Sequence, residues 1–252
     1  MDAAAKSTLT NIILMASALA ALGALGLMLR PTPPNPPAGA AAITLLQMLV
    51  LSGFAAAVAG RAGAAAALLR SAATVLVAGV AGTFIAVVGI LPAQTMVRAM
   101  SIQTCWAIFV FGISAWLSAR RPFQSTIPIT AMAISVIAPL WPILGSPLIQ
   151  WLGQIGFSWP QKVLLSLCPS IWLIKATDSQ TGFNTMAWFH SRTLYHVVPL
   201  GQNVLMPQVW PWLPTALAMA GIGSALIYCV HRRRCKAAGA TTASLATMGV
   251  CR

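Results

Sequence analysis

Six long runs of uncharged, mostly apolar residues constrain the fold of this chain more than any other feature. They cover residues 9–29, 40–59, 71–90, 101–118, 126–148 and 213–230. A helix needs about 20 such residues to cross the hydrocarbon core of a bilayer, and these runs are about that long. The sequence therefore predicts an all-α, polytopic membrane helix bundle, with six spans forming one transmembrane domain over residues 1–252.

The charge content supports the bilayer as solvent. Only 7% of the residues are charged, whereas a soluble domain usually has about 25%. The net charge of +13 does not indicate nucleic-acid binding, because Lys and Arg stand in ones and twos between the apolar runs. The one cluster, Arg232–Arg234 with Lys236, begins a basic tail (231–252) that we interpret as a cytoplasmic anchor facing anionic lipid.

Acidic residues are almost missing from the sequence. Asp2 lies at the start of the chain and Asp178 lies in the long segment between the last two runs. Carriers coupled to protons or sodium usually need a carboxylate inside the membrane, and no run contains one. We therefore do not expect this chain to use an ion gradient by itself.

The first run allows two interpretations. Ala18-Leu19-Ala20 resembles the cleavage site of a signal peptide, but the apolar run continues to Leu29. We therefore predict a first span, followed by a stiff proline-rich connector at 31–37.

The distribution of Lys and Arg predicts the orientation. Placing both termini in the cytoplasm puts ten of these residues inside and five outside, and three of those five lie in the long segment. Basic residues in short loops favour the cytoplasmic side. The sequence thus predicts a multi-pass protein of the inner membrane, with cytoplasmic termini and an external segment over 149–208.

This outer-face segment is too apolar for an ordinary loop. Ser158 stands three residues before Gln161, the spacing of a capping box, and Pro160 fits the first turn of a helix. Pro169 then interrupts the apolar pattern. We predict a re-entrant or interfacial helical segment between spans five and six. It would act either as a gate over a pathway or as an interfacial segment that packs the bundle.

The order of spans and hinges, together with Leu167-Cys168-Pro169 and the apolar turn that ends at Lys175, resembles the permease subunit of type-2 ABC exporters, in a divergent bacterial form. Arg192 to Gly201 also resembles segments of such permeases. Cys168 stands where the family usually has Asn.

The resemblance implies a translocation pathway formed with a second permease subunit, as a homodimer or heterodimer. It also implies a separate soluble ATP-binding subunit, and the sequence contains no phosphate-binding loop of its own. Four residues would face the ATPase: Arg61, Arg70, Arg120 and Arg121. Six residues would form the outer gate: Trp159, Pro169, Trp172, Lys175, Arg192 and Tyr195.

Two other functions compete with this hypothesis. A non-catalytic structural subunit of a larger membrane complex would use the uncharged spans as packing surfaces. A membrane-embedded enzyme would have only Asp178, His190 and His196 as catalytic candidates, and no motif joins them. We expect no enzymatic activity and no cofactor.

Neither a metal site nor a charged cargo is expected. The five cysteines have no paired spacing, and His190 and His196 do not share a helix face. Because we identify no charged or strongly polar side chain within the spans, an apolar or amphipathic cargo is the expectation.

Overall fold

The computed structural model describes residues 36–62, 64–87, 93–120 and 211–249, with single positions within 12–18 and 155–173. Four helices fill this part of the chain: α2 (Pro36–Arg61), α3 (Ala65–Val87), α4 (Ala93–Ser118) and α11 (Trp212–Gly249). The predicted all-helical architecture is confirmed for these residues.

Two helical segments, Ala93–Ser118 and Leu213–Gly239, are long and apolar enough to cross a membrane. Shorter apolar helices cover Leu46–Arg61 and Ala65–Ala81. Most of the first predicted span and all of the fifth lie outside the described residues, so six spans stay a prediction.

The helices extend beyond the apolar runs that predicted them. α3 begins at Ala65 and α4 at Ala93, so the stretches 65–70 and 93–100, which precede the predicted runs 71–90 and 101–118, are helical too. α11 continues through the basic tail to Gly249. Most residues of these extensions are Ala, Leu, Met, Gln, Arg or Lys, which favour helix whether or not they are apolar.

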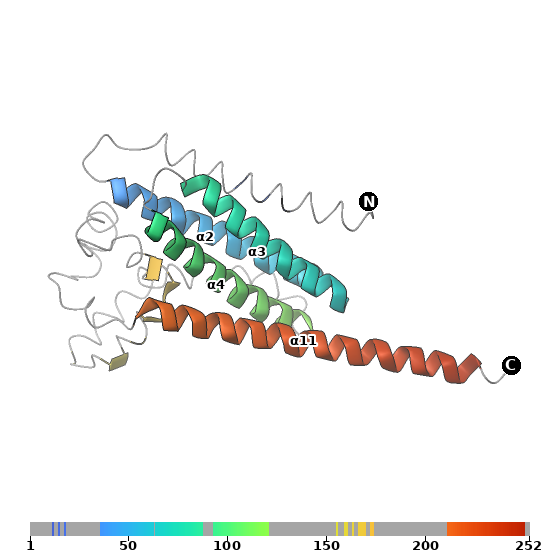
Figure 1. Cartoon of the computed structure of the whole chain (residues 1–252). Helices are drawn as coiled ribbons and strands as arrows, with labels where there is room; N and C mark the ends of the chain where they lie inside the picture. Colours follow the sequence, from blue (N-terminus) through green and yellow to red (C-terminus); the bar gives the residue numbers. More distant parts are fainter. Residues whose placement is uncertain are drawn as a thin grey trace.

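The direction of the helices gathers the cations at one end of the bundle. α2, α4 and α11 run in the same direction (Figure 1). α3, which lies between α2 and α4 in the sequence, runs in the opposite direction. Arg98 lies near the start of α4, at the opposite end. We call the shared end the basic end; its described cations are Arg61, Arg70, Arg120, Arg232, Arg233, Arg234 and Lys236.

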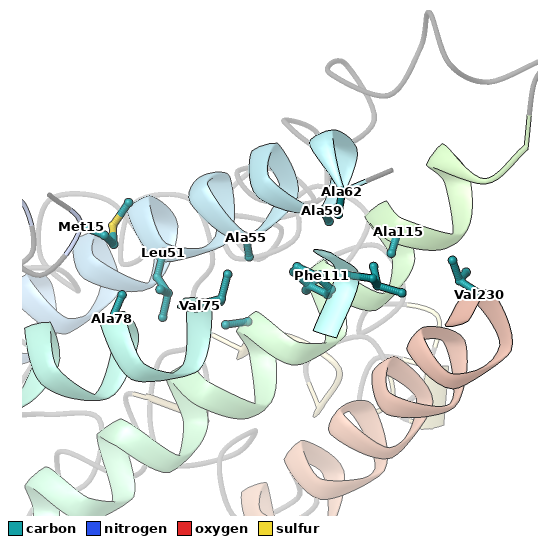
Figure 2. Close-up of a cluster of buried hydrophobic side chains, with 12 residues drawn as sticks. Met15, Leu51, Ala55, Ala59, Ala62, Val75, Ala78, Phe111, Ala115 and Val230 are labelled. Atoms are coloured by element: carbon teal, nitrogen blue, oxygen red, sulfur yellow. The ribbon is translucent and has the colours of Figure 1, made fainter. Parts of the chain in front are cut away.

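Two clusters of buried side chains hold the bundle together. The cluster nearer the basic end joins all four helices through Ala59 of α2, Val75 of α3, Ala115 of α4 and Val230 of α11 (Figure 2). The second cluster combines side chains of α2, α4 and α11 with two residues from the outer-face segment: Met48, Ala56, Ala99, Ile102, Trp106, Val110, Trp172, Leu173 and Ala216.

Glycines allow the closest helix contact, between α4 and α11. A Cβ atom added at Gly223 would lie 2.6 Å from the Ile108 carbonyl oxygen and 2.7 Å from the Phe109 Cα atom. A Cβ atom added at Gly112 would overlap the Gly223 carbonyl group. The two backbones therefore touch at this crossing, which only residues without side chains permit.

Small residues are buried at other positions of the helices too. Ala216 and Gly223 of α11 are both buried. Gly79 of α3 is also buried, and the end of the Leu51 side chain lies against it.

A hydrogen bond joins two segments at the basic end that are far apart in the sequence. The Arg234 guanidinium Nη1 of α11 donates to the carbonyl oxygen of Ala62, directly after the last residue of α2. The last carbonyl groups of a helix have no partner within the helix and carry partial negative charge. A cation therefore caps α2 from a residue 172 positions later in the chain.

Candidate functional site: a buried polar and aromatic group

Two tryptophans from distant parts of the sequence meet inside the bundle. Trp106 of α4 and Trp172 of the outer-face segment have ring centroids 6.5 Å apart and an interplanar angle of 80°. Trp106 also packs against Phe109 at 5.2 Å. An edge-to-face arrangement places the positive ring edge of one tryptophan on the negative face of the other. The outer-face segment is therefore fixed to α4 by aromatic packing.

The position of Trp172 depends on an interrupted helix. The Leu167 backbone N–H donates to the Val163 carbonyl at 3.0 Å, and a second turn begins where the Trp172 N–H donates to the Cys168 carbonyl at 3.4 Å. Leu167 and Cys168, between the turns, are not helical. The indole N–H of Trp172 donates to the Ser166 carbonyl across this break. The break thus supplies the acceptor that orients Trp172.

Two glutamines are buried inside the bundle, and each is a near neighbour in sequence of a residue that belongs to the cluster with both tryptophans. Gln47 of α2 is 0% exposed and precedes Met48, which packs in the same cluster as both tryptophans. Gln103 of α4 is 1% exposed and lies one turn before Trp106. Burying an amide is costly unless it is hydrogen-bonded, so such residues inside an apolar bundle are functional candidates.

The expectation that no strongly polar side chain lies in a span was wrong, because these two amides lie inside predicted spans. Gln47 and Gln103 fall within the runs 40–59 and 101–118. A search for amides as well as charges within the apolar runs finds both.

Trp106 contributes an unused hydrogen-bond donor. Its side chain is 2% exposed, and its Nε1 atom has no hydrogen-bond partner among the described residues. An unsatisfied buried donor costs roughly 1–3 kcal/mol. A donor held in this state can serve an acceptor on a bound molecule.

Replacing Trp172 or Trp106 with phenylalanine is expected to lower the stability of the protein by different amounts. Trp172→Phe removes a made hydrogen bond, whereas Trp106→Phe removes an unsatisfied donor, and each change removes the same ring volume. We expect Trp172→Phe to be the more destabilising by about 1 kcal/mol. Thermal unfolding of the purified variants in detergent measures this difference, and a larger loss for Trp106→Phe would contradict the assignment of the two donors.

The structure places part of the predicted outer gate. Trp159 is 67% exposed, whereas Pro169 and Trp172 are buried. The segment therefore presents one tryptophan outward and one inward. The other predicted gate residues, Lys175, Arg192 and Tyr195, lie outside the described residues.

Three of the four predicted ATPase-facing residues lie at the basic end. Arg61, Arg70 and Arg120 are exposed, and the Arg120 guanidinium carbon lies 3.7 Å from the centre of the Trp116 ring. Cation–π contacts of this kind hold an arginine in one orientation. Arg121 lies outside the described residues.

The alternative catalytic candidates, Asp178, His190 and His196, also lie outside the described residues. Among the residues that the structure describes, no three His, Cys, Asp or Glu side chains gather as metal ligands. His231 and Cys235 of α11 form a pair, with Nε2 and Sγ 3.6 Å apart.

Comparisons with models of protein families, with characterised proteins and with solved structures found no match to this chain.

Proposed function

We propose that this protein is the membrane-spanning permease subunit of an ABC-type transporter. It crosses the inner membrane six times, with both termini in the cytoplasm. A second permease subunit completes the translocation pathway, and a separate soluble subunit hydrolyses ATP. The basic end faces the cytoplasm in this arrangement.

The observation that carries the proposal is the position of α4. Trp106, near the middle of this helix, contacts Trp172 of the outer-face segment, and Arg120 lies exposed just beyond the C-terminal end of the helix. The 26 residues of α4 correspond to about 39 Å, enough to cross the hydrocarbon core. A single rigid helix can therefore transmit a displacement at the ATPase side to the outer segment.

The buried amides refine the expected cargo. Gln47 on α2 and Gln103 on α4 add amide groups to an interior that is mainly apolar and aromatic. A pathway between these helices suits an amphipathic molecule better than a purely apolar one, because amide groups in an apolar interior accommodate the polar part of such a molecule as well as its apolar part.

Charge complementarity favours the contact with an ATPase. Arg61, Arg70 and Arg120 are exposed at the basic end, and the described residues contain no carboxylate that pairs with them. An acidic surface on a soluble subunit would be attracted to these cations.

Copurification tests this function. Tagged full-length protein, extracted under conditions that preserve membrane complexes, is expected to recover an ATP-binding subunit. The triple variant Arg61→Glu, Arg70→Glu, Arg120→Glu should lower that recovery at least tenfold, because each reversal repels the acidic partner. Arg98→Glu, at the opposite end of α4, serves as the control and should leave recovery unchanged. Recovery of no ATPase with the unaltered protein would contradict the permease function.

A non-catalytic structural subunit is the second candidate. The backbone contact at Gly112 and Gly223 favours it, because helices in such close contact suit a packing role. Recovery of a stable complex that lacks an ATPase would support this candidate over the permease.

A further inference from the structure

α11 has one side that faces the bundle and one that faces away from it. Ala216, Gly223 and Val230 are buried at intervals of seven residues, and Arg234 continues the same side toward Ala62. Successive residues turn by about 100° around a helix. The opposite side therefore carries Leu217, Ile222 and Tyr228, which are 56%, 51% and 62% exposed.

The character of this outward side changes abruptly along α11. Up to Cys229 it is uncharged and mainly apolar, and beyond Val230 it carries Arg232, Arg233 and Lys236, all exposed. These three cations have no hydrogen bond, ion pair or ring contact within the part of the chain that the structure describes. They differ in this from Arg234, which caps α2, and from Arg120, which lies on Trp116.

The dimensions of this pattern match one leaflet of a bilayer. Arg232 lies ten positions after Ile222 on α11, which corresponds to a rise of about 15 Å, half of a hydrocarbon core about 30 Å thick. Tyr228 lies one turn before Arg232, at the depth where aromatic side chains favour the membrane interface. Acyl chains can therefore lie along the apolar part while a headgroup reaches the cations.

We infer that the outward side of α11 is a binding surface for an anionic phospholipid of the cytoplasmic leaflet. The phosphate and headgroup contact Arg232, Arg233 and Lys236, and the acyl chains cover the side that bears Ile222 and Tyr228. Uncompensated cations next to an apolar face select an anionic lipid over a zwitterionic one. The inference rests on the bilayer setting of the proposed function and is independent of the ATPase.

Native mass spectrometry of the purified full-length protein tests the inference. The protein is titrated in detergent with phosphatidylglycerol or with phosphatidylcholine of the same acyl chains, and the dissociation constant of the first bound lipid is compared. At low ionic strength we expect phosphatidylglycerol to bind about tenfold more tightly. The triple variant Arg232→Gln, Arg233→Gln, Lys236→Gln should bind both lipids equally.

A charge-matched control separates this surface from the net charge of the chain. Arg61→Gln, Arg70→Gln, Arg120→Gln removes three cations from other helices at the same end and should keep most of the preference. Lys236→Gln alone provides a milder change and should reduce the preference without abolishing it. Unchanged circular dichroism and thermal unfolding show that each variant has kept its fold.

Three outcomes would overturn the inference. The first is an unaltered preference in the Arg232, Arg233 and Lys236 variant. The second is an equal loss in the charge-matched control, which would assign the preference to total charge. The third is displacement of phosphatidylglycerol by soluble glycerol 3-phosphate, which would identify a site for free phosphate. Because no ATPase is present, none of these outcomes depends on the transport function.

Discussion

Gly223→Val is expected to separate α4 from α11 and to destabilise the protein by about 3 kcal/mol or more. The added side chain meets the backbone of Ile108 and Phe109 at 2.6–2.8 Å, and backbone atoms cannot rotate out of its path. One helix must then move away along the whole crossing, which also loosens the contact at Gly112. Thermal unfolding of the purified protein in detergent measures the loss.

Gly221→Val provides a matched control on the same helix. An added Cβ atom at Gly221 meets nothing within 4 Å, so this variant carries the same change in helix propensity without the overlap. We expect its unfolding temperature to stay close to that of the unaltered protein. Equal unfolding temperatures for the two variants would show that α4 and α11 do not touch at Gly223.

Arg234→Gln is expected to cost about 1.5–3 kcal/mol, the value of a hydrogen bond to a charged group. The substitution removes the donor to the Ala62 carbonyl and the positive charge at the C-terminal end of α2. The basic end should then open first. Hydrogen exchange of the last turn of α2, followed by mass spectrometry, measures this local opening.

Arg233→Gln is the appropriate comparison, because the neighbouring cation is exposed and makes no contact with the described residues. It removes the same charge and should leave exchange in α2 unchanged. Faster exchange in both variants would assign the effect to net charge, and slow exchange in both would mean that Arg234 does not cap the helix.

The sequence is sufficient to predict what depends on local pattern. Uncharged runs locate the helices α2, α3, α4 and α11, because apolar length is a local property. Gly79 and Gly223 were predictable as packing positions for the same reason, since small residues on one helix side permit close approach. The gathering of Arg61, Arg70 and Arg120 at one end also follows from the alternation of helix directions.

Features that depend on tertiary contacts could not be predicted in this way. No local signal indicates that Arg234 reaches Ala62, or that Trp172 lies against Trp106, because each pair is far apart in sequence. The ends of α3, α4 and α11 were misjudged for a different reason. Apolar runs mark where a membrane could be, whereas helix propensity decides where the helix ends.

Cysteine accessibility in intact cells tests the orientation on which the transport proposal and the lipid surface both depend. Gln94, exposed at the start of α4, and Cys235, exposed on α11 beyond Val230, lie toward opposite ends of the bundle. The test uses a variant that carries Gln94→Cys and keeps Cys235, with all other cysteines replaced. A membrane-impermeant maleimide should label position 94 in intact cells. It should label Cys235 only after the membrane is permeabilised. Labelling of Cys235 in intact cells, with position 94 protected until permeabilisation, would contradict the account.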